Sequence, residues 1–266
     1  MMPANSFHQN PMLFRFSNMI NKYAFLYQLL DLIPIKSQKV KVFRMLLRFY
    51  KKKNTLIILH KNGQKTVNPL RFQKYLCVRA SGKTTGNTVI IDESQAKGCD
   101  IRLYFWDACN NTFEIGTNNM IHMTAYIRGD NGHATIGDSN YICGATLYLY
   151  CSGTTTLNIG SHNLFSESIT FWGGEGHSVI DPATDTVSNL GGHITIGDNN
   201  WTCMNVCFLK HARIGNGCVI GYGSIVSGDL SKDNKCVIAG NPARVVKRNI
   251  LWSDKEPWKY NGELYI

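Results

Sequence analysis

The residue best suited to chemistry is a histidine inside a glycine-rich segment. His177 lies within residues 172–190, with Glu175 and Asp181 close on either side. An imidazole titrates near neutral pH and can accept a proton, and a carboxylate or a backbone carbonyl can fix its tautomer. We therefore predict His177 as a general base, with Glu175 or Asp181 as a candidate orienting partner. The alternatives are a hydrogen-bonded surface histidine and an Asp181 that only caps the turn at Pro182.

A recurring Ile-Gly dipeptide predicts the scaffold that positions this segment. It begins at residues 115, 136, 159, 196, 214 and 220, and Asp or Asn usually follows within two residues. The spacings are 21, 23, 37, 18 and 6 residues. Because 18 is three times six, the longer spacings are explained as similar turns with loop insertions. The spacing of 37 contains residues 172–190, so the largest insertion carries His177.

The chain can be read in units of six from Ile196, as IGDNNW, TCMNVC, FLKHAR, IGNGCV, IGYGSI and VSGDLS. An aliphatic or bulky residue opens most units, and Val, Ala, Cys or Ser stands at the fifth position of most. Each unit would form a flat strand and a tight turn, and three units would close one triangular coil. The opening residue would fill the interior and the small fifth residue would occupy a corner. The repeat therefore predicts a parallel β-helix.

The first part of the chain has a helical pattern instead. Apolar residues at helical spacing predict one helix over residues 12–33, which Pro34 ends, and a second over residues 38–51. Short apolar runs on both sides of Asn62-Gly63 predict a hairpin over residues 55–70. We accordingly expect a helical, basic extension (1–85), a β-helix domain (86–245) with a loop insertion (172–190), and a C-terminal tail (246–266).

The second predicted helix carries most of the excess positive charge. Residues 36–53 contain eight Lys or Arg residues and no acid, within a net charge of +10 for the chain. Two functions stay open for it. The helix could hold the protein against an anionic inner membrane surface, with Phe43 and Leu47 inserted. It could instead pack, with the first helix, on the open first coil of the β-helix, since terminal repeats need a cap.

Composition excludes several other classes. The basic run comes without any helix-turn-helix, RNA-binding or zinc-finger motif, so we expect no nucleic-acid partner. The sequence has neither a signal-peptide pattern nor an apolar run long enough to span a bilayer, which predicts a cytoplasmic protein. Nine cysteines without a CxxC pair are interpreted as small apolar fillers rather than disulfides or zinc ligands.

Several blocks of the chain resemble the hexapeptide acyltransferases, and more closely the bacterial capsule and polysaccharide O-acetyltransferases. The resemblance covers about residues 110–252 and rests on GHSVID (176–181), ITIGDNNW (194–201), LK (209–210), IGYGS (220–224) and IAGNPAR (238–244). It implies an all-β fold, a left-handed parallel β-helix of hexapeptide repeats with an N-terminal α-helical extension. It also implies a homotrimer whose active sites are shared between subunits.

The activity that the resemblance implies is transfer of an acetyl group from acetyl-CoA to a hydroxyl of a polysaccharide or its sugar precursor. Such a transfer needs a base, donors for the tetrahedral oxyanion and a channel that aligns the thioester. His177 would be the base, and no covalent enzyme intermediate is required. Trp201 occupies the sixth, outward position of its unit, and an aromatic there lies in the groove of the resembling enzymes. It would stack on the sugar or help the oxyanion, or it would only pack subunits together.

Coenzyme A is expected to bind along the end of the β-helix. Glycines at turns would let the pantetheine arm approach the backbone, and basic side chains would meet the phosphates. The alternative for these cations is a solvated basic end. The predicted cofactor-binding residues are Lys210, Gly221, Tyr222, Gly223, Ser224, Ala239, Gly240, Arg244, Lys247 and Arg248.

Two other functions are compatible with the same predicted fold. A zinc enzyme resembling the gamma-class carbonic anhydrases is suggested by His193 and His211, which stand 18 residues apart, but no His-x4-His pair accompanies them. A noncatalytic β-solenoid that binds a surface should repeat Thr once per coil, and Thr135, Thr170 and Thr195 keep no common interval. We therefore expect no metal site.

Overall fold

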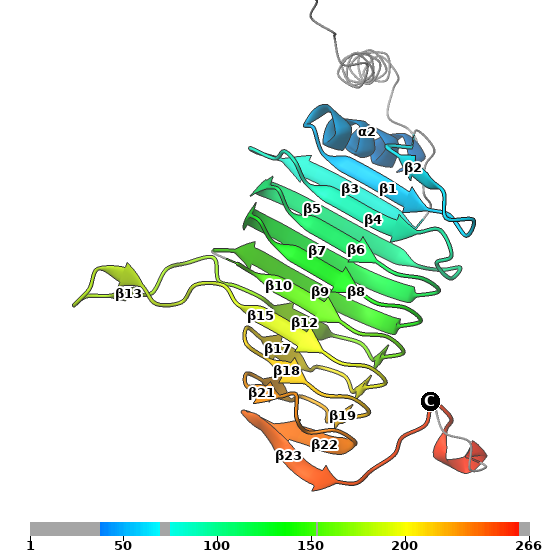
Figure 1. Cartoon of the computed structure of the whole chain (residues 1–266), viewed down its shortest axis with the longest axis vertical. Coiled ribbons are helices and arrows are strands. Elements are labelled where there is room, and N and C mark those ends of the chain that lie inside the picture. The colour runs from blue at the N-terminus through cyan, green and yellow to red at the C-terminus, as the bar shows by residue number, and fades with distance from the viewer. Residues whose placement is uncertain (1–37, 70–74, 153, 261–266) are drawn as a thin grey trace, which may run out of the picture.

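The computed structural model describes residues 38–69, 75–152 and 154–260, and short parallel strands stacked into coils dominate it (Figure 1). The helix predicted over residues 12–33 lies outside the described residues. The helix predicted over residues 38–51 is present as α2 (Gln38–Lys51).

One flat face of the stack is a sheet in which each strand pairs with the equivalent strand one coil away. The order is β2-β1-β4-β6-β8-β10-β15-β18-β21, and every pair except β1–β2 is parallel. The strands are β2 (Lys65–Val67), β1 (Thr55–Leu59), β4 (Thr88–Asp92), β6 (Thr112–Ile115), β8 (His133–Ile136), β10 (Thr156–Ile159), β15 (His193–Ile196), β18 (Arg213–Ile214) and β21 (Asp229–Leu230).

The other two faces share long strands that bend around a corner. β9 (Tyr141–Cys151) pairs with β11 (Leu164–Phe165) through its first residues and with β12 (Ile169–Trp172) through later ones. The second face continues through β16 (Trp201–Thr202), β19 (Val219–Ile220) and β22 (Cys236–Gly240). The third face contains β3 (Leu76–Ser81), β5 (Asp100–Cys109), β7 (Met120–Asp130), β9, β12, β17 (Cys207–Leu209) and β20 (Ile225–Val226).

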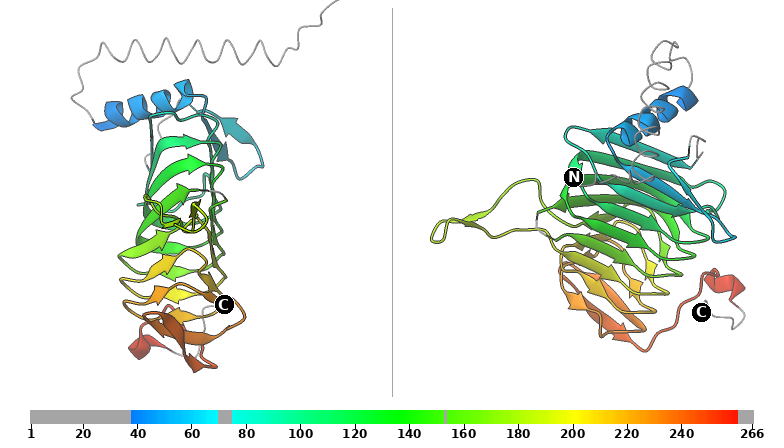
Figure 2. Two further views of the ribbon diagram at one scale, coloured as in Figure 1. Left: turned by 90° about the vertical axis from the view of Figure 1, so that its left-hand side faces the viewer. Right: turned by 45° about the horizontal axis from the view of Figure 1, so that its top comes forward.

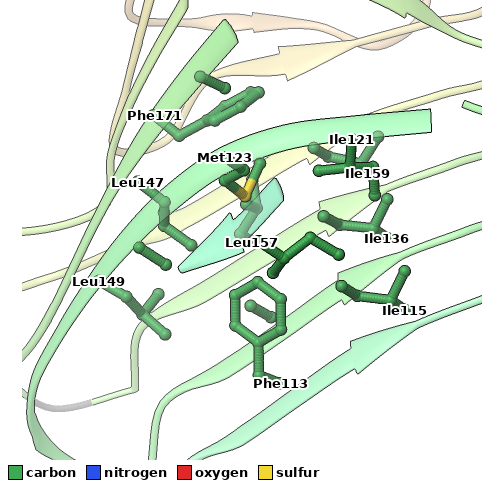
Figure 3. Close-up of a cluster of buried hydrophobic side chains, with 14 of the residues drawn as sticks. Phe113, Ile115, Ile121, Met123, Ile136, Leu147, Leu149, Leu157, Ile159 and Phe171 are labelled. Carbon is green, nitrogen blue, oxygen red and sulfur yellow. The ribbon is translucent and has the colours of Figure 1, made fainter. Parts of the chain in front are cut away.

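The pairing register confirms the coil length read from the sequence. Trp201 faces Val219 and Cys207 faces Ile225, so these coils repeat every 18 residues. Thr156 faces His193 across the coil that holds the long insertion. The residues that open the six-residue units are buried in a continuous interior. Figure 3 shows the same interior at earlier coils, with side chains from Phe113 to Phe171. The fifth residues Val206, Ala212, Cys218 and Ser224 are buried as predicted.

A column of asparagines explains why Asn follows Ile-Gly. Asn119, Asn140, Asn163 and Asn200 are almost completely buried at one corner. The side-chain oxygen of each accepts a backbone N–H from the next coil, and the amides of Asn140 and Asn200 donate to glycine carbonyls. An amide side chain supplies both a donor and an acceptor, so the same bonds can repeat in every coil. The glycine three residues before each one is needed for space: a Cβ on Gly197 would lie 2.6 Å from the Gly215 carbonyl oxygen.

The helix α2 covers the first coil. Leu46, Leu47, Phe49 and Tyr50 are buried against the coil interior, and Phe43 is half-buried there. The expectation that Leu47 inserts into a membrane is wrong, because its side chain is fully buried in the protein core. No helix among the described residues is long and apolar enough to cross a bilayer.

The stack begins earlier than the sequence suggested. The hairpin predicted around Asn62-Gly63 forms from β1 and β2, but β1 also pairs in parallel with β4, and β3 pairs with β5. The boundary expected at residue 86 therefore falls inside the stack. At the other end, β23 (Ala243–Arg248) turns back antiparallel to β22, and a short 3-10 turn follows at η1 (Pro257–Lys259).

Candidate active site

His177 lies on a hairpin that leaves the β-helix after β12 and returns at β15. The hairpin contains β13 (Ile180–Asp181) and β14 (Thr186–Val187), paired antiparallel. It projects sideways from the coils, as Figure 1 and the right-hand view of Figure 2 show. His177 is exposed near the point where the hairpin leaves the body of the protein.

The base of this hairpin is held by Lys210. Its Nζ lies 2.9 Å from Glu175 Oε2 and donates to the carbonyl oxygens of Asn189 and Leu190, both at 3.1 Å. Both partners of the ion pair are mostly shielded, with 20% and 32% of the side chains exposed. Two of the predicted site residues are thus brought together, although the sequence had placed Lys210 on coenzyme A phosphates and Glu175 beside the imidazole.

A residue that the sequence analysis missed shapes the backbone at His177. The Asn189 side chain donates to the His177 carbonyl oxygen at 2.9 Å and accepts the Val179 N–H at 2.7 Å. It therefore fixes the backbone of the segment 177–179, ahead of β13. Among the described residues, no side chain lies within hydrogen-bonding distance of the His177 imidazole itself.

Asp181 has the turn-capping position that was the alternative to a catalytic one. Its carboxylate accepts the Ala183 N–H at 2.8 Å, and its carbonyl accepts the Asp185 N–H at 2.9 Å. Both bonds close the turn at the tip of the hairpin.

Trp201 points outward from β16, as its place in the six-residue unit predicted. Its side chain is 37% exposed, and its ring centroid lies 6.3 Å from that of Trp252. The Trp252 indole N–H donates to the Asn199 carbonyl at 2.7 Å, which holds this part of the tail against the coil. This pairing was not predicted, because the last coils of the stack separate Trp201 from Trp252 along the chain.

The glycine-rich turn predicted to accept coenzyme A lies at the corner between β19 and β20. Gly223 has a φ of 68°, which favours glycine. The buried Ser224 hydroxyl donates to the Gly221 carbonyl at 2.6 Å and accepts the Gly240 N–H at 3.2 Å, so it ties this turn to the next coil. Tyr222 is 70% exposed beside it. Gly221 is stacked directly on Ala239.

The predicted cations fall into two places. Arg244, Lys247 and Arg248 lie on β23 at the C-terminal end of the stack, where Arg248 is paired with Asp233 at 2.6 Å. Lys210 lies instead at the base of the hairpin. The cluster of four cations expected from the sequence is thus reduced to the three on β23.

Cysteine thiols near these groups are kept protonated. Burial raises the pKa of Cys151, at the base of the hairpin, to about 12. Burial also raises the pKa of Cys203 and Cys207 on the coil that carries Trp201. Because the thiolate is the nucleophilic form, these cysteines are poor candidates for a covalent step. This favours chemistry through a proton acceptor such as His177.

His193 and His211 lie one coil apart, as the spacing predicted, with the His211 N–H donating to the His193 carbonyl. The His193 ring is engaged by the Thr156 hydroxyl at 2.9 Å. No group of three His, Cys, Asp or Glu residues able to hold a metal ion is found in the part of the chain that the structure describes.

The repeats after the hairpin match a known family model. Residues 193–228 match the family described as "Bacterial transferase hexapeptide (six repeats)". Two curated relatives match over a short part of the chain. "Putative acetyltransferase SAR2635" of Staphylococcus aureus (strain MRSA252) is 42% identical over 57 residues, 21% of this chain and 28% of that protein. "Putative lipopolysaccharide biosynthesis O-acetyl transferase WbbJ" of Escherichia coli (strain K12) is 40% identical over 55 residues, 21% of this chain and 27% of that protein. The match thus spans less than a third of these curated relatives.

Two solved structures share the fold over most of the chain. The polySia-specific acetyltransferase NeuO aligns with a TM-score of 0.61 and 24% identity, covering 78% of this chain and 81% of that one. The polysialic acid O-acetyltransferase OatWY aligns with a TM-score of 0.51 and 24% identity, covering 68% of this chain and 93% of that one. The predicted left-handed parallel β-helix of hexapeptide repeats, with a helix ahead of it, is confirmed.

Proposed function

We propose that the protein is an O-acetyltransferase that moves an acetyl group from acetyl-CoA to a hydroxyl of a bacterial cell-surface polysaccharide or its sugar precursor. The observation that carries the proposal is the exposed His177 on a hairpin inserted into a hexapeptide coil, directly before the repeats that match a transferase family. The names of the two curated relatives and of the two structural neighbours support the reaction and the acceptor class.

In the proposed reaction, the His177 imidazole takes the proton of the acceptor hydroxyl as its oxygen attacks the thioester carbonyl. The tetrahedral intermediate then collapses, the carbon–sulfur bond breaks, and the imidazolium returns the proton to the departing thiolate. Asn189 and the Lys210–Glu175 pair hold the backbone that carries the imidazole. The glycine-rich turn at 221–224, with Ala239 and Gly240, offers exposed backbone for the pantetheine arm, and Arg244 and Lys247 offer charge for the phosphates.

Transfer is tested by incubating the purified protein with acetyl-CoA and a panel of polysaccharides, while the released thiol is measured. We expect thiol release that depends on an acidic polysaccharide and on His177. Equal release with and without every acceptor would reject transfer to a sugar. Zinc-dependent hydration of carbon dioxide by the same preparation would favour the carbonic-anhydrase alternative.

We further propose a homotrimer in which the hairpin packs on a neighbouring subunit. Four large apolar side chains of the hairpin are exposed in the single chain: Val179 by 59%, Ile180 by 56%, Val187 by 40% and Leu190 by 51%. Apolar residues gathered on a projecting hairpin indicate a surface that another chain covers. Such packing would also bring His177 of one subunit toward the glycine-rich turn or Trp201 of another, since these groups lie at different corners of one chain.

Ile180→Asp is expected to dissociate the trimer to a species of the 29.9 kDa chain mass and to abolish transfer at the same time. The reason is that a charge in an apolar contact must be desolvated without a partner. Light scattering coupled to size exclusion measures the mass. Thr184→Asp is the matched control, because it adds the same charge to an exposed polar site of the hairpin and should leave the trimer intact. A wild-type monomer, or an active trimer of Ile180→Asp, would contradict the proposal.

Trp201→Ala is expected to raise KM for the acceptor about tenfold, the loss of one stacking contact, while KM for acetyl-CoA changes less than about twofold. Steady-state kinetics with each substrate varied in turn checks the split. If the substitution instead raises both KM values equally and lowers the melting temperature, Trp201 serves in packing against Trp252 and not in acceptor binding.

The cytoplasmic location and a peripheral membrane contact through residues 36–53 stay predictions. Since the apolar face of α2 is buried, any such contact would rest on exposed basic side chains such as Lys41 and Lys53. Sedimentation with anionic vesicles tests it.

A further inference from the structure

The outer surface of the third face carries a column of aromatic side chains in register. Tyr104 faces Tyr126, Tyr126 faces Tyr148, and Tyr148 faces Trp172 on successive coils. The ring centroids are 5.5, 5.4 and 4.6 Å apart, and the first two pairs are stacked. These four residues are called the aromatic column below. With about 4.8 Å between paired strands, the column extends roughly 15 Å along the β-helix.

Arginines flank the aromatic column on the same face. Arg79 pairs with Tyr104 from the coil before it, so it continues the column by one coil. Arg128 lies two residues after Tyr126 and pairs with Trp106, and its guanidinium lies 4.7 Å from the centre of the Trp106 ring. Arg79 and Arg128 are exposed, and among the ion pairs of the described residues neither has a carboxylate partner. The face thus combines flat rings with positive charge. A hollow of about 530 Å³ is lined by the two arginines and by the rings of Tyr104, Trp106, Tyr126 and Tyr150.

This hollow continues toward the candidate base. A second hollow of about 200 Å³ shares Arg128 and Tyr150 with the first and is also lined by Glu175 and Gly176. Trp172 ends the aromatic column, and the chain enters the hairpin directly after it. The groove therefore leads along the third face to the residue before His177.

We propose that this groove binds an anionic polysaccharide along the β-helix and guides it to the active site. The inference rests on the proposed function, because it takes the acceptor to be a polymer acted on at His177. Because these rings stack on one another, they form a continuous apolar surface along the β-helix, and the apolar C–H faces of sugars can pack on it. Guanidinium groups supply paired donors for carboxylates of the polymer. The charge complementarity and the connection to the hairpin identify the polymer, rather than a second copy of the chain, as the occupant.

Calorimetric titration of the full chain with polysialic acid, without acetyl-CoA, tests the groove independently of catalysis. Tyr126→Ala should raise Kd about tenfold, whereas Tyr126→Phe should stay near wild type because the ring is kept. Arg128→Gln should raise Kd and weaken its dependence on salt. Tyr260→Ala is the matched control, since it removes an equally exposed ring from the C-terminal segment. In kinetics, Tyr126→Ala should raise KM for the polymer by a similar factor with kcat nearly unchanged.

Several results would overturn the inference. An unchanged Kd for Tyr126→Ala is one such result. Equal binding of neutral dextran of the same length, or tighter binding of a single-stranded oligonucleotide, is another. Loss of the trimer in Tyr126→Ala would show instead that this face is a subunit contact. Polymer binding that depends on Tyr126 in a protein without transferase activity would support the groove while rejecting the proposed function.

Discussion

His177→Ala is expected to lower turnover about a hundredfold or more, the usual loss for a positioned general base. The melting temperature and the oligomeric mass should stay unchanged, because the side chain is exposed and only its backbone carbonyl is bonded, to Asn189. The measurement is thiol release at saturating acetyl-CoA and acceptor.

His122→Ala is the matched control for this loss, since it removes another exposed imidazole, from β7, and should keep normal turnover. Turnover near the wild-type value in His177→Ala would rule out the proposed mechanism. A loss that is accompanied by dissociation of the trimer would point to assembly instead.

Phe171→Ala is expected to destabilise the fold by about 3 to 5 kcal/mol, because it leaves a cavity in the middle of the stack. The Phe171 side chain is fully buried, stacks on Phe208 at 5.4 Å and meets Phe165 edge-on at 5.7 Å. Urea unfolding followed by circular dichroism, at one fixed protein concentration, gives the free energy. Phe171→Leu should lose much less, and a loss below about 1 kcal/mol in Phe171→Ala would show that the neighbouring coils close the cavity.

The regular coils could be predicted from the sequence because their period is short and unbroken. Between Ile196 and Val226 every coil has 18 residues, so the buried and corner positions follow by counting. The earlier coils are longer and unequal, and only the backbone pairing fixes which residues share a face. The aromatic column was missed for this reason, although Tyr104, Tyr126 and Tyr148 recur every 22 residues, a signal that a search at other periods would have found.

The candidate site was predicted only in part, for a related reason. The spacing of 37 residues between the Ile-Gly dipeptides at 159 and 196 located the insertion that carries His177. The imidazole was then chosen for its ability to accept a proton near neutral pH. Glu175 lies inside the insertion, and Lys210 lies 35 residues after Glu175. Two separate roles were therefore predicted for residues that form one ion pair. Likewise, Leu47 has the same helical spacing whether its helix lies on a membrane or on a coil, and only the packing distinguishes them.

The two ends of the stack determine how long the β-helix can become. A terminal coil with free backbone N–H and C=O groups is a template on which another chain could continue the ladder. Here α2 and the antiparallel β2 cover the first coil, and the antiparallel β23 occupies the backbone of β22 in the last. End-to-end pairing is thereby hindered at the first coil and at β22, while β20 and β21 remain the outermost strands of their faces among the described residues. The parallel pairing that stacks the coils is thus kept within one chain, and the β-helix has a fixed length. The sides of the β-helix are then the surfaces for association and for ligands.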